Sequence, residues 1–243
     1  KFNDGTKSYF VELTDPYLSF NALPASNINA NCLLIPGKEE NVKIEGLTPL
    51  INPQTIRPGV KRITAITFDN KDMNVNRTNI RFGSEASITR AANIDLSKED
   101  QEKSLSESIS SDFTTPVKIT ASNFGDLTKL TDTVVTSYAY NVKKALTDIA
   151  GLKIFSMPWG DKFDNVNFTT LETREYPFSF WELQRTEVEY EQITVTLPTG
   201  SVLVEMPKDV QLSCPVGEYS IKYEKGKLPN EFVATRTFKR TKD

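Results

Sequence analysis

The stretch VKRITAITFDNKDMNVNRTNIRF, residues 60–82, decides the fold class of this chain. Its first part alternates between two sets of side chains, Val60, Arg62, Thr64, Ile66 and Phe68 against Lys61, Ile63, Ala65 and Thr67. A period of two is the pattern of a β-strand whose two faces meet different surroundings. Residues 73–82 are again rich in β-branched side chains and follow turn-forming residues. The stretch therefore predicts two successive strands.

Similar patterns predict further strands in the rest of the chain, and a different pattern predicts one helix. We expect strands within residues 86–94, 117–124, 131–146, 152–159, 188–198, 201–207, 217–224 and 230–240. Pro198-Thr199-Gly200 is typical of a tight turn. The helix is predicted at residues 95–109, where Ser97 and Asp100 fit a capping box and Leu105 and Ile109 are one turn apart. Its thin apolar stripe indicates a surface helix.

The fold class that follows is mainly β. We expect an antiparallel β-sandwich or a large twisted sheet with one surface helix. An irregular segment rich in proline and asparagine, residues 14–60, precedes it. Proline removes backbone donors and disfavours helix in the residue before it, so this segment should be extended or turning.

Composition excludes several classes of function. The chain has 29 basic and 32 acidic residues and a net charge of −3, without the basic surface that nucleic acid requires. No apolar run approaches the roughly 20 residues of a membrane span, and we expect no transmembrane segment. No signal peptide is present within this chain, so an export signal would have to lie upstream.

Histidine is absent, which removes the commonest general base and the commonest metal ligand. No Cys-His or Ser-His catalytic pair can form within the chain. Cys32 and Cys214 could form a disulfide in an oxidising compartment, but two separate thiols are the simpler interpretation. We expect no cofactor.

Two patterns of polar residues are candidate sites. Asp72, Asn74 and Asn76 have the spacing of an ion-binding loop, but Arg77 and Gly83 stand where a glycine and a bidentate glutamate are needed. We interpret the stretch as a turn leading into a strand and expect no metal. Alternating carboxylates could serve glycoside hydrolysis, yet next to apolar neighbours they are more typical of a solvated sheet face. These carboxylates are Glu187, Glu189 and Glu191.

A group of aromatic residues is the candidate binding site. Such side chains could form a platform on which a sugar or peptide stacks, or they could fill the core. They are Trp159, Tyr176, Phe178, Phe180 and Trp181.

Two stretches resemble parts of one known protein family. YFVELTDPYLSFNALP, residues 9–24, followed by CLLIPG, resembles the segment that closes a transglutaminase-like (papain-type cysteine) core in secreted multidomain proteins of Gram-negative bacteria. Residues 174–224 resemble the C-terminal β domain of unknown function that follows this core. The matching positions of the first stretch are Phe10, Thr14, Asp15, Tyr17, Phe20, Leu23 and Pro24. Those of the second include residues 174–177, 197–198 and 204–208.

The resemblance implies that the catalytic Cys and His of such a protein would lie upstream of Lys1. Glu12 then occupies the position of the third catalytic residue, an aspartate in the family, and has nothing to act on in this chain. Residues 1–58 are expected to be the last strand of that core and a connecting segment. Residues 59–243 are expected to be a β-sandwich domain, which could subdivide near residue 115.

The function implied is that of a non-catalytic accessory or interaction β domain, in a protein exported to the periplasm or cell surface. Its expected partners are the upstream transglutaminase-like domain and a protein, peptide or glycan. The alternative is an independent glycan- or peptide-binding β-sandwich module. On either hypothesis the chain is not an enzyme.

Overall fold

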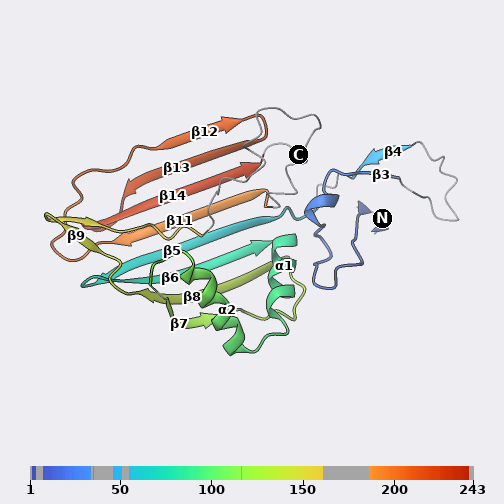
Figure 1. Ribbon diagram of the computed structural model, residues 1–243. Helices are drawn as coiled ribbons and strands as arrows, with labels where there is room; N and C mark the ends of the chain where they lie inside the picture. Colours follow the sequence, from blue (N-terminus) through green and yellow to red (C-terminus); the bar gives the residue numbers. More distant parts are fainter. Residues whose placement is uncertain are drawn as a thin grey trace.

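One large β-sheet forms the centre of the molecule (Figure 1). The computed structural model describes residues 2–3, 8–33, 35, 46–50, 55–115, 117–160 and 186–240. Eight strands lie side by side in the order β12-β13-β14-β11-β5-β6-β8-β7. All neighbours are antiparallel except β5 and β11, which run parallel. The predicted mainly β fold is confirmed. Of its two alternatives the large sheet is the one found, and this sheet is mixed and not fully antiparallel.

The sheet is built from strands of very different length. Its members are β5 (Gly59–Asp69), β6 (Asp72–Phe82), β7 (Lys118–Asn123), β8 (Thr133–Val142), β11 (Val188–Thr196), β12 (Val210–Cys214), β13 (Gly217–Lys225) and β14 (Glu231–Arg240). Three short pairs lie outside it: β1 (Phe2–Asn3) with β2 (Ser8–Tyr9), β3 (Asn31–Leu33) with β4 (Leu47–Pro49), and β9 (Thr147–Ile149) with β10 (Leu152–Ile154). A short 3-10 helix spans Ala25–Asn27.

The alternation of β5 is confirmed by burial. Val60, Arg62, Thr64 and Ile66 are buried, whereas Lys61, Ile63, Ala65 and Thr67 are exposed. The buried side of the sheet carries the main core, made of apolar residues from four adjacent strands with contributions from a helix and a loop. Its fully buried members include Ile66, Met73, Val75, Tyr140, Val142, Ile193 and Val195, joined by Ile109 and Val117. This apolar core occupies only part of the covered face.

Helix α2 (Lys98–Ser110) begins as the sequence predicts. The backbone N–H of Asp100 donates to Ser97 Oγ at 3.1 Å, and Ser97 Oγ donates to Asp100 Oδ2 at 2.6 Å. Ile109 is buried and Leu105 packs against the main core, so the thin apolar stripe holds the helix on the sheet. Helices α1 and α2 lie over the part of the sheet formed by β6, β8 and β7 (Figure 1).

The strand predicted at residues 86–94 is wrong, because this segment forms helix α1 (Ser84–Asn93). Gly83 ends β6 with φ +59°, and a Cβ there would lie 2.7 Å from the carbonyl oxygen of Ile56. This conformation suits glycine and turns the chain out of the sheet. Alanine-rich residues beyond it favour a helix, and Ala86 and Arg90, four residues apart, are both buried. The described residues thus contain two α-helices instead of the single predicted helix.

Two further strand predictions need correction. Residues 201–207 form no strand, and Val202 and Val204 are exposed. The turn before them is confirmed, since the N–H of Ser201 donates to the carbonyl of Pro198 at 3.0 Å. Within residues 152–159 only β10, Leu152–Ile154, is a strand. The alternation of Val202 and Val204 is typical of a strand. In the described structure, however, no neighbouring strand pairs with residues 201–207.

The proline-rich N-terminal segment is attached to helix α1. Ser87 Oγ donates to Asp15 Oδ2 at 2.5 Å, and Arg90 Nη1 donates to the carbonyl of Tyr17 at 3.1 Å. Further along, the N–H of Ile56 donates to the carbonyl of Asn21 at 2.7 Å. Leu18, Ala22 and Leu23 are buried. The segment therefore packs against the domain that contains the sheet.

Candidate functional site

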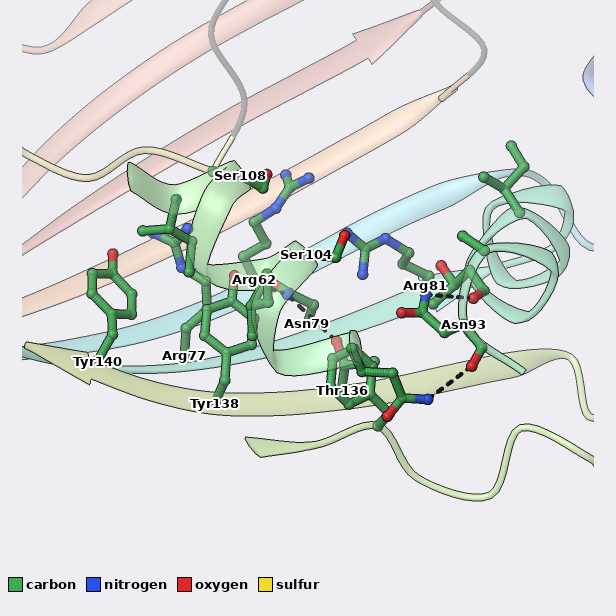
Figure 2. A pocket seen from close by; sticks show the side chains of 18 of the residues that line it. Arg62, Arg77, Asn79, Arg81, Asn93, Ser104, Ser108, Thr136, Tyr138 and Tyr140 are labelled. Atoms are coloured by element: carbon green, nitrogen blue, oxygen red, sulfur yellow. Dashed lines mark hydrogen bonds between the residues drawn. The ribbon is translucent and has the colours of Figure 1, made fainter. Parts of the chain in front are cut away.

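A cavity of about 400 Å³ lies between the sheet and the two helices (Figure 2). We call it the helix–sheet pocket. Its floor comes from β5, β6 and β8, and its walls come from α1 and α2. The cavity falls within the range of roughly 300–1,000 Å³ usual for small-molecule sites. Its position on the covered face makes it the first candidate for a binding site.

The floor of the pocket is polar because alternate residues on three neighbouring strands are polar. Strand β6 contributes Arg77, Asn79 and Arg81, spaced two residues apart, so all three point to the same face. The register pairs Asn79 with Arg62 on β5 and with Thr136 on β8, and Arg77 with Tyr138. The pairing of strands therefore gathers these side chains in one place.

Helix α2 forms one of the two walls above this floor. Ser104 and Ser108 are one helical turn apart and line the pocket next to the arginines (Figure 2). Near the other end, Gln101 Nε2 donates to the carbonyl of Asn93 at 2.8 Å, which ties α2 to the end of α1. Hydroxyl, amide and guanidinium groups thus surround one shared space.

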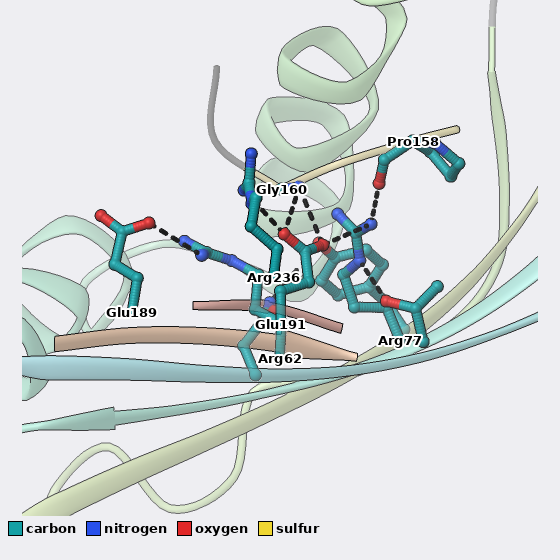
Figure 3. Close-up of polar contacts among 10 residues, drawn as sticks. Arg62, Arg77, Pro158, Gly160, Glu189, Glu191 and Arg236 are labelled. Carbon is teal, nitrogen blue, oxygen red and sulfur yellow. Dashed lines mark hydrogen bonds and ion pairs between the residues drawn. The ribbon is translucent and has the colours of Figure 1, made fainter. Parts of the chain in front are cut away.

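Directly beside the pocket lies a buried ion-pair cluster, which we call the arginine cluster: Arg62, Arg77, Arg236, Glu189 and Glu191 (Figure 3). Glu191 is 1% exposed and forms ion pairs with Arg236 Nη2 at 2.8 Å and Arg77 Nη2 at 3.3 Å. Arg62 Nη1 lies 3.7 Å from Glu189 Oε2. Buried charges require such partners, because an unpaired charge in a poorly solvated site is costly.

The chain beyond β10 completes the arginine cluster. The N–H of Gly160 donates to both carboxylate oxygens of Glu191, at 2.9 and 3.0 Å. A Cβ at this position would lie 2.4 Å from Cδ of Arg62, so only glycine fits without movement of that side chain. The carbonyl of Pro158 accepts from Arg77 Nη2, and the ring of Trp159 lies 4.8 Å from Cζ of Arg236.

Arg77 connects the cluster to the pocket. Burial lowers the pKa of Arg77, but the ionised phenols of Tyr138 and Tyr140 in the alkaline range, together with the Glu191 carboxylate, outweigh this and raise the pKa above its ordinary value. Its Nε donates to Thr64 Oγ1 at 3.0 Å. The guanidinium is therefore charged and fixed in orientation, which suits a binding or structural role and not proton transfer.

The interpretation of Glu189 and Glu191 as part of a solvated sheet face is wrong. Both are buried, on the same side of the sheet as Ile193 and Val195. Glu191 is opposite Arg62 on β5 and opposite Arg236 on β14. The sequence shows the alternation but not the neighbouring strands, which alone reveal that arginines surround these carboxylates.

None of the other predicted site residues that the structure describes lines the pocket. Tyr176, Phe178, Phe180 and Trp181 are outside the described residues, so only Trp159 of the aromatic platform is placed, against the main core and Arg236. Its role in ligand binding stays a prediction. Glu12 accepts from the N–H of Thr14 at 2.6 Å and from Thr14 Oγ1 at 2.5 Å, bonds that lower its pKa.

Asp72, Asn74 and Asn76 lie on β6, as the turn-and-strand interpretation predicts. Asp72 Oδ2 pairs with Lys143 Nζ at 2.6 Å, and Asn141 Nδ2 donates to Asn74 Oδ1 at 2.8 Å. Cys32 and Cys214 are free thiols. Neither cysteine lines the helix–sheet pocket.

The pocket residues were missed by the sequence analysis, although a pattern pointed to them. Arg77, Asn79 and Arg81 alternate on β6 with Thr78 and Ile80, and Arg62 lies on the face of β5 that carries Val60 and Ile66. Polar side chains on the apolar side of a strand indicate a buried polar site, because burial requires them to find partners.

Comparison with known families identifies only the C-terminal part of the chain. Residues 151–242 match a family described as a domain of unknown function with a solved structure, DUF3858. This range holds Glu189, Glu191 and Arg236, whereas Arg62 and Arg77 precede it. No curated protein matches the chain. In the part of the chain that the structure describes, no helix is long and apolar enough to span a membrane.

The pKa of Tyr140, which lines the pocket, allows a test of its burial. Its side chain is 2% exposed, and burial raises its pKa from 10 to about 12, although Arg77 counteracts this effect. Because the folded-state pKa is the higher one, stability is full below pH 10 and is lost as the pH rises from 10 to 12. We expect a loss of about 2–3 kcal/mol over this interval that is absent in Tyr140→Phe. Urea unfolding at several pH values measures it, and equal losses in both proteins would contradict the prediction.

Proposed function

We propose that this chain is a non-catalytic accessory domain that acts by binding, with the helix–sheet pocket as its binding site. The observation that carries the proposal is the polar cavity itself, in which charged side chains are held by partners and hydroxyl and amide groups face one space. A catalytic site needs a nucleophile with a base, or an acid and base with separated pKa values. The absence of histidine and the position of both cysteines outside the pocket support binding over catalysis.

We also propose that this domain is part of a longer protein with a transglutaminase-like core upstream. Residues 9–24 and 174–224 resemble the end of a transglutaminase-like core and the β domain that follows it, and we propose that such a core is the upstream partner. The match to a domain of unknown function over residues 151–242 is compatible with the second resemblance. An exported location follows from the same resemblance. The sequence encoded upstream and fractionation of the producing cells test both, and a cytosolic protein without such a core would contradict them.

The binding role predicts that filling the pocket abolishes ligand binding. Ser108 is an exposed residue of α2 that lines the pocket, so Ser108→Trp should occupy the cavity without disturbing the core. The full chain, labelled with ¹⁵N, is titrated with neutral sugars, sugar acids, amino acids and small dicarboxylates. We expect at least one class to shift the backbone resonances of pocket residues in the wild type and to shift none of them in Ser108→Trp.

The matched control is Glu107→Trp, a neighbouring exposed residue of α2 that does not line the pocket. It should bind as the wild type does. Shifts that survive in Ser108→Trp, or the absence of shifts with every compound, would overturn the pocket as a binding site. Turnover of any compound by the isolated chain would overturn the non-catalytic role.

A further inference from the structure

The helix–sheet pocket also indicates the class of ligand, an inference that rests on its proposed binding function. The first argument is charge. Three arginines and two carboxylates line the pocket: Arg62, Arg77, Arg81, Glu85 and Asp112. Arg236, Glu189 and Glu191 of the arginine cluster lie beside it, so that four arginines accompany four carboxylates in the pocket and the cluster together. A ligand with a net charge would leave an uncompensated charge in a partly desolvated site, which is costly. The balance therefore favours a ligand without net charge.

The second argument is an unsatisfied acceptor at the floor of the pocket. Asn79 is 3% exposed and lines the cavity. Its Nδ2 lies within 3.5 Å of Thr136 Oγ1 and 3.4 Å of the Tyr138 hydroxyl, as a donor to both. No group in the described part of the chain donates to Asn79 Oδ1. A buried acceptor without a donor costs about 1–3 kcal/mol, so a ligand O–H or N–H that reaches it recovers free energy.

The third argument is the mixture of groups on the walls. Hydroxyls can donate and accept, and they are supplied by Ser104, Ser108, Thr136 and Tyr138. Guanidinium groups only donate, and carboxylates only accept. Ligand pockets are usually lined mostly by apolar side chains, whereas here polar and charged residues outnumber apolar ones such as Ile88, Leu105 and Phe124. A ligand with several hydroxyls and one apolar C–H face matches this lining.

We infer that the helix–sheet pocket binds a neutral sugar. Asn79 Oδ1 accepts from a sugar hydroxyl, the arginines that line the pocket donate to sugar oxygens, and Glu85 and Asp112 accept from further hydroxyls. A zwitterionic amino acid also lacks net charge, but it offers one ammonium group and one carboxylate where the walls present many dispersed donors and acceptors. A sugar acid meets the hydroxyl groups but adds a negative charge. These two classes are the alternatives that the experiment must separate.

The test uses the full ¹⁵N-labelled chain and named compounds. Glucose, galactose, mannose and N-acetylglucosamine are compared with glucuronate and with glycine and glutamine. Methyl glycosides of the four neutral sugars distinguish a terminal sugar of a glycan, which they imitate, from a free sugar with a reducing end. We expect at least one neutral sugar or its glycoside to shift the side-chain amide resonances of Asn79 and to bind at least tenfold more tightly than glucuronate or the amino acids.

Substitutions in the floor of the pocket test which side chains bind the sugar. Asn79→Leu removes the carbonyl oxygen and the NH₂ group of the side-chain amide at similar volume. It should weaken binding of the sugar at least tenfold. Should this variant not fold, Thr136→Val removes one floor hydroxyl at constant shape and should weaken binding severalfold. The control is Thr78→Val, the same change on the opposite face of β6, which should leave affinity unchanged.

The outcomes separate this inference from the proposed function. Preferential binding of glucuronate or of an amino acid in the pocket would overturn the sugar inference and leave the binding site standing. Sugar binding that is equal in Asn79→Leu and the wild type would also overturn it. Absence of binding for every compound in both panels would overturn the inference and the proposed function together.

Discussion

Glu191→Ala is expected to destabilise the protein by about 3–5 kcal/mol, the usual result when one partner of a buried ion pair is removed. Glu191 is 1% exposed, forms an ion pair with Arg77, and accepts hydrogen bonds from Arg236 and the N–H of Gly160. Without its carboxylate, two guanidinium groups remain buried beside each other with less compensation. Urea unfolding at pH 7, followed by circular dichroism, measures the change.

The control for Glu191 is Glu224→Ala, the same substitution at an exposed position of β13 in the same sheet. It should change stability by less than about 0.5 kcal/mol. A double variant, Glu191→Met with Arg236→Met, should be less destabilised than the sum of the single changes, because it removes both charges together. Stability of Glu191→Ala within 1 kcal/mol of the wild type would show that the arginine cluster is not a buried ion-pair network.

Arg90→Met is the second change with a large expected effect. Arg90 is completely buried, and its guanidinium donates to the carbonyls of Tyr17, Lys129 and Thr131, at 3.1, 3.1 and 2.5 Å. Methionine fills similar space but leaves these buried carbonyls without a donor, each of which carries a desolvation cost. We expect a loss of about 2–4 kcal/mol in the free energy of unfolding.

Arg90 also joins the N-terminal segment to the sheet domain, which gives a second measurement. Limited proteolysis of Arg90→Met should cleave near residues 13–20 faster than in the wild type, because the contact to Tyr17 is lost. Arg90→Lys keeps the charge but not the planar fork of donors, so it should restore only part of the stability. Arg90→Met with wild-type stability and the same cleavage rate would show that this contact does not attach the segment.

The sequence was sufficient to predict secondary structure where a local pattern is compatible with only one conformation. The alternation of residues 60–68 predicts two different faces, and the structure shows that the face with Val60, Thr64 and Ile66 is the buried one. The cap at Ser97 is likewise local, because donor and acceptor lie three residues apart. These features predicted the β class, most of the long strands and the surface helix.

Local patterns failed where they have two explanations. Residues 86–94 contain both alanines, which favour helix, and β-branched residues, which favour strand. The geometry at Gly83 and burial against the sheet decided for a helix. Residues 201–207 alternate as a strand does, yet a strand also needs a neighbour with which to pair, and that neighbour is not specified in the segment itself.

Composition and alternation are properties of the chain alone, so they were enough to predict a mainly β protein in which histidine takes no part. The candidate site, in contrast, exists only in the folded protein. Arg62, Asn79, Thr136 and Glu191 lie on four different strands. They meet because β5 pairs with β6 on one side and with β11 in parallel on the other, and because β6 also pairs with β8. Strand register depends on burial of residues that are far apart in sequence. The Glu191 carboxylate, which the alternating pattern predicted to be solvated, is therefore buried among arginines.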